Sequence, residues 1–501
     1  MIYNLPFAVL KRSYRRIHFV GVGGSGVSAL AHLMLQMGYE VTGSDCQSTT
    51  VTEGLKRAGA TIWHGHDERY VRLADLVVYS TAVPPENPEL VFAKERGIAV
   101  LTRIELLAYL AQRHDSIVIS GSHGKSTTTS MVATVFMAAQ RDPTVVIGSV
   151  LKHSVGSARL GKGTVFICEG DESNNSILQF KPNVAVVTNI DCDHLDFHGS
   201  MSNLKSSFIQ FLNSPPRNGF AVVCLDDDNI RSLMSQLQRR VVTYGFHPDA
   251  EYQVQGRRLN SEGGLTFEVH HRDDGPLGMI NLRLPGDHNI QNALATVASC
   301  RGMGVSFDTI SFALENFPGV YRRYDMLYAN GVYVIDDYAH HPSEIHALLS
   351  SVREVFPGRI RAVFQPHRFT RSKNLAQQFP PAFIDADEVI LAPIYTANER
   401  PIAGIGLDYL NRFFQRRYNE RKLKCMQLFG DIADYLYESV MPGDVILTVG
   451  AGDIYQVGYE LANRLARRDS EVAAGVDFER LQESIGDEVA FQAEENDAAR
   501  D

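Results

Sequence analysis

The segment GSHGKS, residues 121–126, carries the side chains that a nucleotide phosphate requires. It follows the strand-like residues 116–120 and precedes a helix-like segment. Backbone N–H groups at such a helix start would point at an anion, which the helix dipole also favours. Lys125 would reach the β- and γ-phosphates, and the Ser126 hydroxyl would ligate Mg²⁺. The general pattern has a glycine where Ile119 stands, so this loop is shorter. The order of strand, loop, Lys-Ser and helix predicts nucleotide binding rather than a chance glycine turn.

Acidic side chains and a histidine follow two later strand-like segments, TVFIC and NVAVVTNI. These residues are Glu169, Asp171, Glu172, Asp191, Asp193 and His194. Ligands of open α/β sheets bind outside the carboxyl ends of the strands, so we expect these groups beside the phosphate loop. There they would hold Mg²⁺ between ATP and a second substrate. Each segment alone is more often a solvated turn. These two strand ends and the one before the phosphate loop make three in one unit, which favours a site. The alternative is a zinc site without thiolates, formed by His194, Asp196 and His198.

A second glycine-rich segment, GVGGSG at residues 21–26, follows the first strand-like segment. Asp45 ends the next strand-like segment about 20 residues on, which resembles a dinucleotide-binding fingerprint. Alone, this pattern predicts only that a diphosphate binds there. Two nucleotide sites in one chain indicate ATP at one and a nucleotide-linked substrate or a dinucleotide at the other.

Histidines and arginines gather after two further strand-like segments, in DDYAHHPSE (336–344) and FQPHRFTRS (364–372). They would suit an anionic substrate and a developing acyl phosphate. Either segment alone could be a structural turn. The competing interpretation is a solvated basic face, made of His367, Arg368 and Arg371.

Strand-like and helix-like segments alternate along most of the chain, which predicts an α/β protein with mostly parallel sheets and crossover helices. In the second unit we expect a helix over residues 125–139 and antiparallel strands over residues 250–284. The turn-rich NFPGV at 316–320 marks a boundary. We expect domains at residues 1–113, 114–316 and 317–468, and an acidic, disordered tail at 469–501.

Length, composition and charge fit several globular domains. The chain has 501 residues, 44% of them apolar and 21% charged, and a single domain usually has roughly 150. Its net charge of −10 lies almost wholly in residues 469–501, whose 11 acids and 2 bases leave −1 for the rest. The body therefore lacks the basic surface that nucleic acid binding requires.

Cysteine usage and hydropathy favour a cytoplasmic protein. The six cysteines form no CxxC pair, which speaks against a disulfide framework and suits a reducing compartment. In the opening segment MIYNLPFAVLKRSYRR the basic residues follow the apolar stretch, the wrong order for a signal peptide. No run approaches the roughly 20 apolar residues of a membrane helix, so we expect no membrane insertion.

Taken together, these segments resemble the Mur ligases of peptidoglycan synthesis over residues 16–465. The opening HFVGVGGSGVSALA resembles the family's UDP-sugar segment. Counterparts also exist for GSHGKSTTT, EGDES, TNIDCDHLD, GDHNIQNALA, GVYRRYD, DDYAHHPSE and FQPHRFTR. The histidine of GSHGK and the last two segments resemble the family member that adds L-alanine to UDP-N-acetylmuramate.

The resemblance implies three domains: a Rossmann-like UDP-sugar domain, a central P-loop-type ATPase domain and a Rossmann-like C-terminal domain. It also implies an ATP-dependent amide ligase. ATP would phosphorylate the lactyl carboxylate, and the amine of L-alanine would attack the acyl phosphate to give an amide, ADP and phosphate. The partners would be the small molecules UDP-N-acetylmuramate and L-alanine, with ATP and Mg²⁺ as cofactors, in a monomer or homodimer.

Carried over by position, the resemblance implies roles for individual residues. ATP would contact Gly121, Ser122, His123, Gly124, Lys125, Ser126, Thr127, Asn289, Asn292, Arg323 and Asp337. The UDP diphosphate would approach Gly23, Gly24, Ser25 and Gly26, with Asp45 near the ribose or uracil. Metal ions would be bound by Ser126, Glu169 and His194. The muramoyl carboxylate and alanine would be surrounded by His340, His367, Arg368 and Arg371. The catalytic set would be Lys125, Glu169, His194, His340 and Arg371.

Several positions depart from the family pattern. Ser126 replaces the commoner Thr and keeps its hydroxyl, Tyr324 stands in place of Phe, and Ala339 in place of Gly. Asp287 stands where a basic residue is usual before His288, which reverses a charge near the expected adenine contacts.

Three alternatives remain. A recycling ligase would join a tripeptide to the same UDP-sugar, but DEYD-like and LEFDH-like segments are expected there, whereas this chain has DESN and IDCDH. A nicotinamide-dependent oxidoreductase would use GVGGSG and leave GSHGKS without a role. A non-catalytic protein that binds UDP-N-acetylmuramate would not need Lys125, Glu169 and His194.

Overall fold

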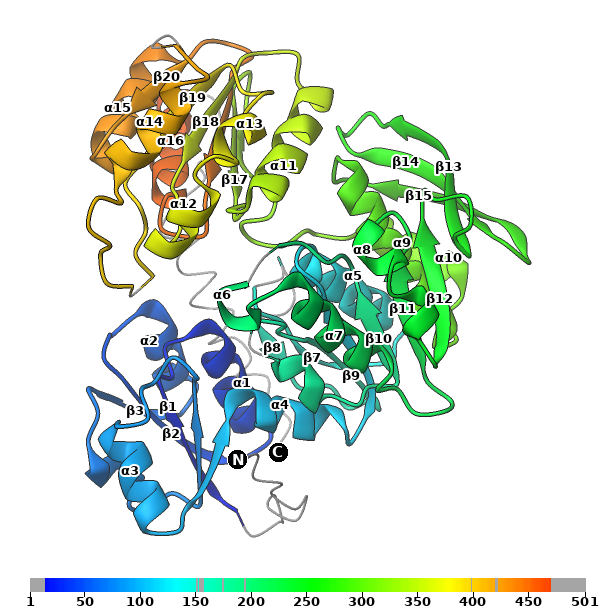
Figure 1. Cartoon of the computed structure of the whole chain (residues 1–501), viewed down its shortest axis with the longest axis vertical. Coiled ribbons are helices and arrows are strands. Elements are labelled where there is room, and N and C mark those ends of the chain that lie inside the picture. The colour runs from blue at the N-terminus through cyan, green and yellow to red at the C-terminus, as the bar shows by residue number, and fades with distance from the viewer. Residues whose placement is uncertain are drawn as a thin grey trace.

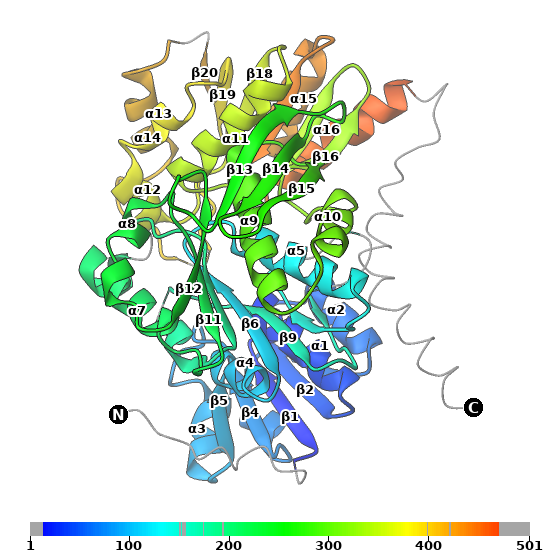
Figure 2. The same cartoon turned by 90° about the vertical axis from the view of Figure 1, so that its right-hand side faces the viewer.

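Three units, each built around its own sheet, make up the computed structural model (Figures 1 and 2). It describes residues 14–149, 152, 157–173, 175–192, 195–397, 399–419 and 422–469. Figure 2 shows the N-terminal unit at the bottom, the central unit in the middle and the C-terminal unit at the top. The central unit therefore has a neighbour on each side.

The N-terminal unit is a parallel sheet in the order β3-β2-β1-β4-β5. Its strands are β1 (Arg16–Val20), β2 (Glu40–Asp45), β3 (Thr61–His64), β4 (Leu76–Tyr79) and β5 (Ala99–Thr102). Its helices are α1 (Ser25–Gln36), α2 (Thr50–Arg57), α3 (Pro88–Glu95) and α4 (Arg103–Ala111). The strand order reverses between β1 and β4. The glycine turn after β1 therefore lies at the switch point, where open α/β sheets bind ligands.

The central unit is a larger sheet in the order β15-β14-β13-β12-β11-β10-β6-β9-β7-β8. From β7 to β12 all neighbours pair in parallel, and their strands are almost continuously apolar because both faces are covered. These strands are β6 (Asp115–Ser120), β7 (Thr144–Val146), β9 (Val165–Glu169), β10 (Val184–Val187), β11 (Phe220–Cys224) and β12 (Arg240–Gly245). The edge strands are β8 (Ala158–Arg159), β13 (Tyr252–Leu259), β14 (Leu265–His271) and β15 (Gly275–Leu282). The helices are α5 (Lys125–Ala138), α6 (Leu195–His198), α7 (Met201–Leu212), α8 (Asp228–Arg231), α9 (Asp287–Gly302) and α10 (Phe307–Glu315).

The C-terminal unit has the strand order β16-β17-β21-β18-β19-β20, in which only the β16–β17 pair is antiparallel. Its strands are β16 (Asp325–Ala329), β17 (Tyr333–Asp337), β18 (Ile360–Phe364), β19 (Glu388–Leu391), β20 (Leu423–Cys425) and β21 (Val445–Val449). Its helices are α11 (Pro342–Val355), α12 (Phe369–Leu375), α13 (Phe379–Ala382), α14 (Leu407–Gln415), α15 (Phe429–Ser439) and α16 (Tyr455–Asp469).

The expected fold class is confirmed, since all three units combine mostly parallel strands with crossover helices. The predicted helix at 125–139 is α5, and the predicted antiparallel strands are β13 to β15 at the sheet edge. Some short strands escaped sequence analysis, β3 among them. None of its four residues is buried, so it carries no apolar pattern.

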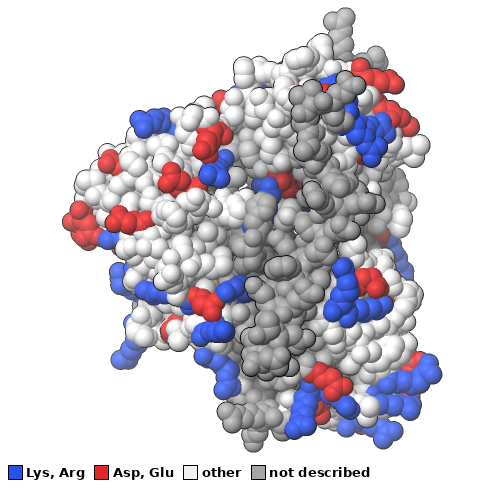
Figure 3. Space-filling model, turned by 180° about the vertical axis from the view of Figure 1, so that it is seen from behind, with Lys and Arg blue, Asp and Glu red and all other residues white. Residues whose placement is uncertain are grey.

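The surface and the helices bear on two further expectations. In Figure 3, basic and acidic side chains lie beside one another on the upper part of the face shown, and basic ones predominate on its lower part. No helix in the described part of the chain has the length and apolarity to cross a membrane. The expected tail lies outside the described residues, apart from Asp469 at the end of α16.

Candidate active site

The glycine loop turns sharply between β6 and α5 because two of its residues adopt backbone angles that favour glycine. The φ angles of Gly121 and Gly124 are +129° and +80°. A Cβ atom on Gly124 would lie 2.5 Å from Oδ1 of Asn292, and one on Gly121 would lie 2.2 Å from Oγ1 of Thr188. Helix α5 begins at Lys125 without a side-chain cap, which leaves its first N–H groups to an anion.

Lys125 is held by the backbone of this loop and by a neighbouring acid. Its Nζ donates to the carbonyl oxygens of Gly121 and Ser122, and to Oε1 of Glu172 at 2.8 Å. Burial alone would lower the pKa of Lys125, but nearby carboxylates, Glu172 foremost, outweigh burial and raise it. Burial raises the pKa of Glu172 to about 7, against the pull of the lysine. Lys125 therefore stays charged at neutral pH, at the start of α5.

Two further acids, one at the end of β9 and one just after it, lie near Lys125. Oε1 of Glu169, the last residue of β9, accepts a hydrogen bond from the Gly148 N–H at 2.9 Å. Oδ2 of Asp171 lies 3.4 Å from a guanidinium nitrogen of Arg103, the first residue of α4 in the N-terminal unit. A hydroxyl at Ser126 and a carboxylate at Glu169 are hard oxygen donors, so this pair fits Mg²⁺.

Two metal-site expectations fall on the segment after β10. His194 and Asp193 lie outside the described residues. The zinc alternative finds no support at His198, which is buried and whose Nε2 donates to the carbonyl oxygen of Glu172 at 2.8 Å. The His198 ring therefore holds the loop that carries Asp171 and Glu172.

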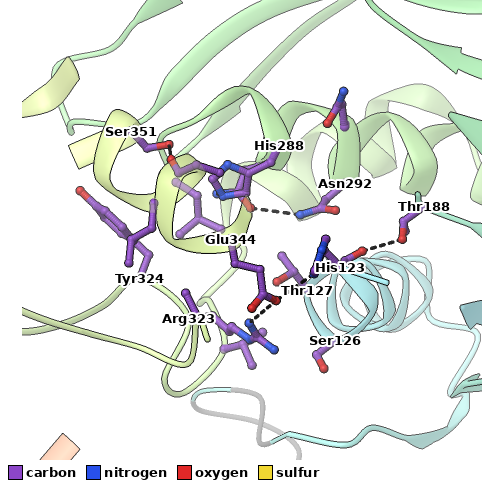
Figure 4. Close-up of a pocket in the computed structure, with 18 of the residues that line it drawn as sticks. His123, Ser126, Thr127, Thr188, His288, Asn292, Arg323, Tyr324, Glu344 and Ser351 are labelled. Carbon is purple, nitrogen blue, oxygen red and sulfur yellow. Dashed lines mark hydrogen bonds and ion pairs between the residues drawn. The ribbon is translucent and has the colours of Figure 1, made fainter. Parts of the chain in front are cut away.

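A cavity of about 200 Å³ lies between the central and C-terminal units (Figure 4). The glycine loop, the end of β10 and the start of α9 form one wall, and the turn before β16 and the helix α11 form the other. Eight of the residues expected to contact ATP line this cavity: His123, Gly124, Ser126, Thr127, Asn289, Asn292, Arg323 and Asp337. The other three, Gly121, Ser122 and Lys125, adjoin them in the same loop.

The α9 side of the cavity is polar but uncharged. Nδ2 of Asn292 donates to Oδ1 of Asn289 at 3.2 Å, and the Thr128 hydroxyl donates to Oδ1 of Asn292 at 3.1 Å. Burial lowers the pKa of His288 to about 4, so its ring is neutral at physiological pH. Amides and a neutral imidazole suit an uncharged heterocycle such as adenine.

Asp337 fixes the turn that carries Arg323. Its carboxylate accepts hydrogen bonds from the backbone N–H groups of Tyr324 and Ala339, each at 2.7 Å. Burial raises the pKa of Asp337 to about 6, although Arg323 opposes the rise. Tyr324 has a φ of +49°, and this strained turn places Arg323 in the cavity wall.

The structure brings three residues of the expected histidine–arginine cluster together in the C-terminal unit. The rings of His340 and His367 lie 5.6 Å apart, and Nδ1 of His367 is 3.0 Å from NH1 of Arg371. Burial lowers the pKa of His340 to about 4. The side chain of Arg368, at the start of α12, is 43% exposed, and its Nε lies 3.9 Å from Oε1 of Glu399.

In the N-terminal unit, Asp45 holds the glycine turn. Its Oδ2 accepts a hydrogen bond from the Gly23 N–H at 2.8 Å, and its Oδ1 accepts one from the Gln47 N–H at 3.0 Å. A Cβ atom on Gly26 would lie 2.7 Å from a guanidinium nitrogen of Arg103, so this turn packs against the arginine that also pairs with the acid loop. The other expected residues, Gly24 and Ser25, lie at the start of α1.

Two partners of the expected site residues were missed by sequence analysis, Arg103 and Glu344. Glu344 ends the segment DDYAHHPSE and stands three residues after the N-cap of α11, a spacing typical of a capping box. The sequence could therefore have indicated its role at the helix start. Its contact with the glycine loop, described below, joins residues 221 positions apart, and no local pattern signals it.

Comparison with known families gives the class of protein that this fold and this site define. The model described as "Mur ligase family, catalytic domain" matches residues 16–115, and "Mur ligase middle domain" matches residues 119–300. The model "Mur ligase, glutamate ligase domain" matches residues 322–452. The chain therefore belongs to the Mur ligase family.

Individual relatives narrow the comparison. The UDP-N-acetylmuramate–L-alanine ligase of Pelotomaculum thermopropionicum is 44% identical over 453 residues, 90% of this chain and 98% of that protein. That of Syntrophus aciditrophicus is 43% identical over 468 residues, 93% and 97% of the two chains. The solved structure of the alanine ligase MurC from Thermotoga maritima is 30% identical, with a TM-score of 0.76 over 90% of this chain and 99% of that chain. A murein peptide ligase from Psychrobacter arcticus shares the fold, with a TM-score of 0.66 at 22% identity over 92% and 100% of the chains.

Proposed function

We propose that this chain is an ATP-dependent amide ligase that joins L-alanine to the lactyl carboxylate of UDP-N-acetylmuramate. The carboxylate is first phosphorylated, and the amine of alanine then displaces phosphate from the acyl phosphate. The observation that carries the proposal is the cavity between the central and C-terminal units. It combines a phosphate loop with an uncharged polar wall, and both walls of the cavity hold residues that Mur ligases are expected to use.

The central unit would bind and orient the nucleotide. The first N–H groups of α5 and the charged Lys125 would hold the terminal phosphates and offset charge that develops during transfer. Mg²⁺ bound by Ser126 and Glu169 would supply further positive charge between the anionic groups. Asn289 and Asn292 would hold adenine by their amides.

The C-terminal unit would receive alanine and the muramoyl carboxylate. Arg371, held by His367, would bind a carboxylate as a fixed cation. Nδ1 of His340 lies 3.0 Å from the carbonyl oxygen of Tyr338, which can only accept, so the ring proton sits on Nδ1. Nε2 of His340 then has a lone pair, and with a pKa of about 4 the ring is neutral and would accept a hydrogen bond from the amino group of alanine rather than its proton.

The N-terminal unit would bind the UDP-sugar at the turn after β1. Gly23, Gly24 and Gly26 would let the backbone approach the diphosphate, as glycines do at such turns. Asp45 holds this turn in place through the Gly23 N–H. Because ATP and nucleotide sugars are cytoplasmic, we place the reaction in the cytoplasm, in a monomer or homodimer.

The experiment is phosphate release from ATP and Mg²⁺ with UDP-N-acetylmuramate, and with either L-alanine or the tripeptide as second substrate. Turnover with alanine alone supports the proposal. Turnover only with the tripeptide would make the chain a recycling ligase, and no turnover with either would overturn both assignments. The segments DESN and IDCDH, together with 44% identity to an alanine ligase over 90% of the chain, favour alanine.

A further inference from the structure

His123, in the glycine loop, contacts two carboxylates from different units. Its Nε2 lies 2.9 Å from Oδ2 of Asp191, which follows β10, and its Nδ1 lies 3.1 Å from Oε1 of Glu344 on α11. A carboxylate accepts and does not donate, so each ring nitrogen must carry a proton to make these contacts. Both contacts are satisfied when His123 is an imidazolium, which makes it a second cation of the loop beside Lys125.

The groups around His123 support that charge state. The Ser343 hydroxyl donates to Oδ2 of Asp191 at 2.6 Å, and the ring of His341 lies 5.2 Å away, centroid to centroid. Burial would lower the pKa of His123, but Glu344 and Asp191 outweigh burial and raise it to about 9. Three further ionisable groups face these two carboxylates. Arg323 lies 3.9 Å from Oε1 of Glu344, and Nδ1 of His340 lies 3.4 Å from its Oε2. Nδ1 of His341 lies 3.4 Å from Oδ2 of Asp191.

The two carboxylate oxygens of Glu344 contact different groups. Oε2 accepts hydrogen bonds from the backbone N–H groups of His340 at 3.0 Å and His341 at 3.1 Å, which fixes the first turn of α11. Oε1 faces His123 and Arg323, as Figure 4 shows. Because the helix start fixes one oxygen, the other has a defined position at the glycine loop.

The two cations of the loop also differ in where they lie. His123 lines the cavity, whereas Nζ of Lys125 turns back to the carbonyl oxygens of Gly121 and Ser122. Of the two loop cations, His123 is therefore the one in the cavity wall, opposite Arg323 of the C-terminal unit. The position of the His123 ring depends on Glu344, a residue of the other unit.

We propose that Glu344 is a positioning residue for phosphoryl transfer: from the docked C-terminal unit it holds the His123 imidazolium, and with it the glycine loop, in place at the terminal phosphates. This inference rests on the proposed function. It ties the geometry of the phosphate loop to docking of the unit that receives alanine. The positive charge of His123 would thus be held at the terminal phosphates only when the C-terminal unit, which receives alanine, is docked.

The first test separates kcat from KM. Glu344→Gln keeps a carbonyl oxygen for the helix cap and loses the charge that faces His123. We expect kcat to fall about 10- to 100-fold while the KM for ATP stays within about threefold, because the contact acts on the transferring phosphate. The matched control is Glu354→Gln, on the same helix in another contact between the two units, which should keep kcat within about twofold. Equal losses in both variants would mean that Glu344 only docks the helix.

A double-mutant cycle tests whether Glu344 acts through His123. In the His123→Asn background, Glu344→Gln should lower kcat by less than about twofold, because the charge it positions is already gone. The same loss in both backgrounds would overturn the proposal.

A readout without turnover keeps this inference separate from the proposed function. Amide hydrogen exchange of residues 121–124 should rise at least about fivefold in Glu344→Gln and stay unchanged in Glu354→Gln. Wild-type protein that releases no phosphate with alanine would defeat the proposed function, and the exchange result would still decide the role of Glu344. Unchanged exchange in Glu344→Gln would defeat the inference even in an active ligase.

Discussion

The two cations of the glycine loop keep their charge through different partners. Lys125 relies on Glu172, an acid of the same unit, whereas His123 relies on Asp191 and on Glu344 across the cavity. Removal of the lysine should therefore leave contacts between units intact. Removal of the histidine charge should weaken them.

The Lys125→Ala variant should lose at least about 100-fold in ATP-dependent turnover, since the lysine is the loop's fixed cation for phosphoryl transfer. Its dissociation constant for UDP-N-acetylmuramate should stay within about twofold, because the turn held by Asp45 lies in another unit. Phosphate release and calorimetric titration measure the two effects. A folded variant that loses both would contradict the separate placement of the two sites.

The pKa of His123 predicts a pH dependence of stability. That pKa is raised to about 9, from 6.5 in an unfolded chain, so the folded protein binds this proton more tightly. Its contribution is fully present below about pH 6.5 and is lost as the pH rises through 9. The wild-type Tm should therefore fall more steeply over this interval than that of His123→Asn, as followed by calorimetry. Parallel curves for the two proteins would show that the ring carries no such proton.

At the scale of elements, helix α11 is docked at both ends. Its first turn brings Glu344 to the glycine loop. Near its last turn, both oxygens of Glu354 accept from Arg257 of β13, at 2.6 and 2.7 Å. Arg257 also bonds to Asp287 at the start of α9. The acid at position 287 thus has a cationic partner and lies at a helix N-terminus that favours negative charge.

A substitution at Asp287 tests this arrangement. Asp287→Lys should raise the dissociation constant of a non-hydrolysable ATP analogue several-fold. The lysine would repel Arg257 and place a cation at the N-terminus of α9, the helix that lines the cavity with Asn289 and Asn292. Asp287→Asn should change it by less than about twofold, since an exposed ion pair contributes only about 0–1 kcal/mol and the Asp287 side chain is 56% exposed. Calorimetric titration compares the two variants. Equal affinities would show that the charge at 287 does not reach the cavity.

The sequence predicts those parts of the site that local patterns encode. The loop before α5, the acids after β9 and the order of the parallel strands follow from short motifs and from apolar strands buried on both faces. Contacts between units carry no such signal. The pair of Arg103 with Asp171 and that of His123 with Glu344 depend on how whole units dock.

At the scale of the whole molecule, the apolar core divides the chain unequally. One buried cluster runs through the N-terminal and central units, from Ile17 to Val320, by way of α4. The C-terminal unit has clusters of its own on the two faces of its sheet. It meets the central unit through ion pairs, those of Glu344, Glu354 and the pair Lys152–Asp325. Polar contacts of this kind permit relative motion of domains, so the C-terminal unit is the one we expect to move.

Spin-label distances can test which unit moves. Cys46 and Cys425 are exposed cysteines of the N- and C-terminal units, and Met279 is an exposed residue of the central unit. Every variant carries Met279→Cys, which adds a label site in the central unit, and Cys192→Ser, which removes the other exposed cysteine there. Adding Cys425→Ser leaves labels at positions 46 and 279, a pair between the N-terminal and central units. Cys46→Ser leaves a pair between the central and C-terminal units. Adding an ATP analogue, Mg²⁺ and UDP-N-acetylmuramate should narrow and shorten the second distance distribution, because the nucleotide fills a cavity walled by both units. The first distribution should stay fixed by the shared apolar core. A shift of the first pair alone would mean that the N-terminal unit moves, against what the division of the core predicts.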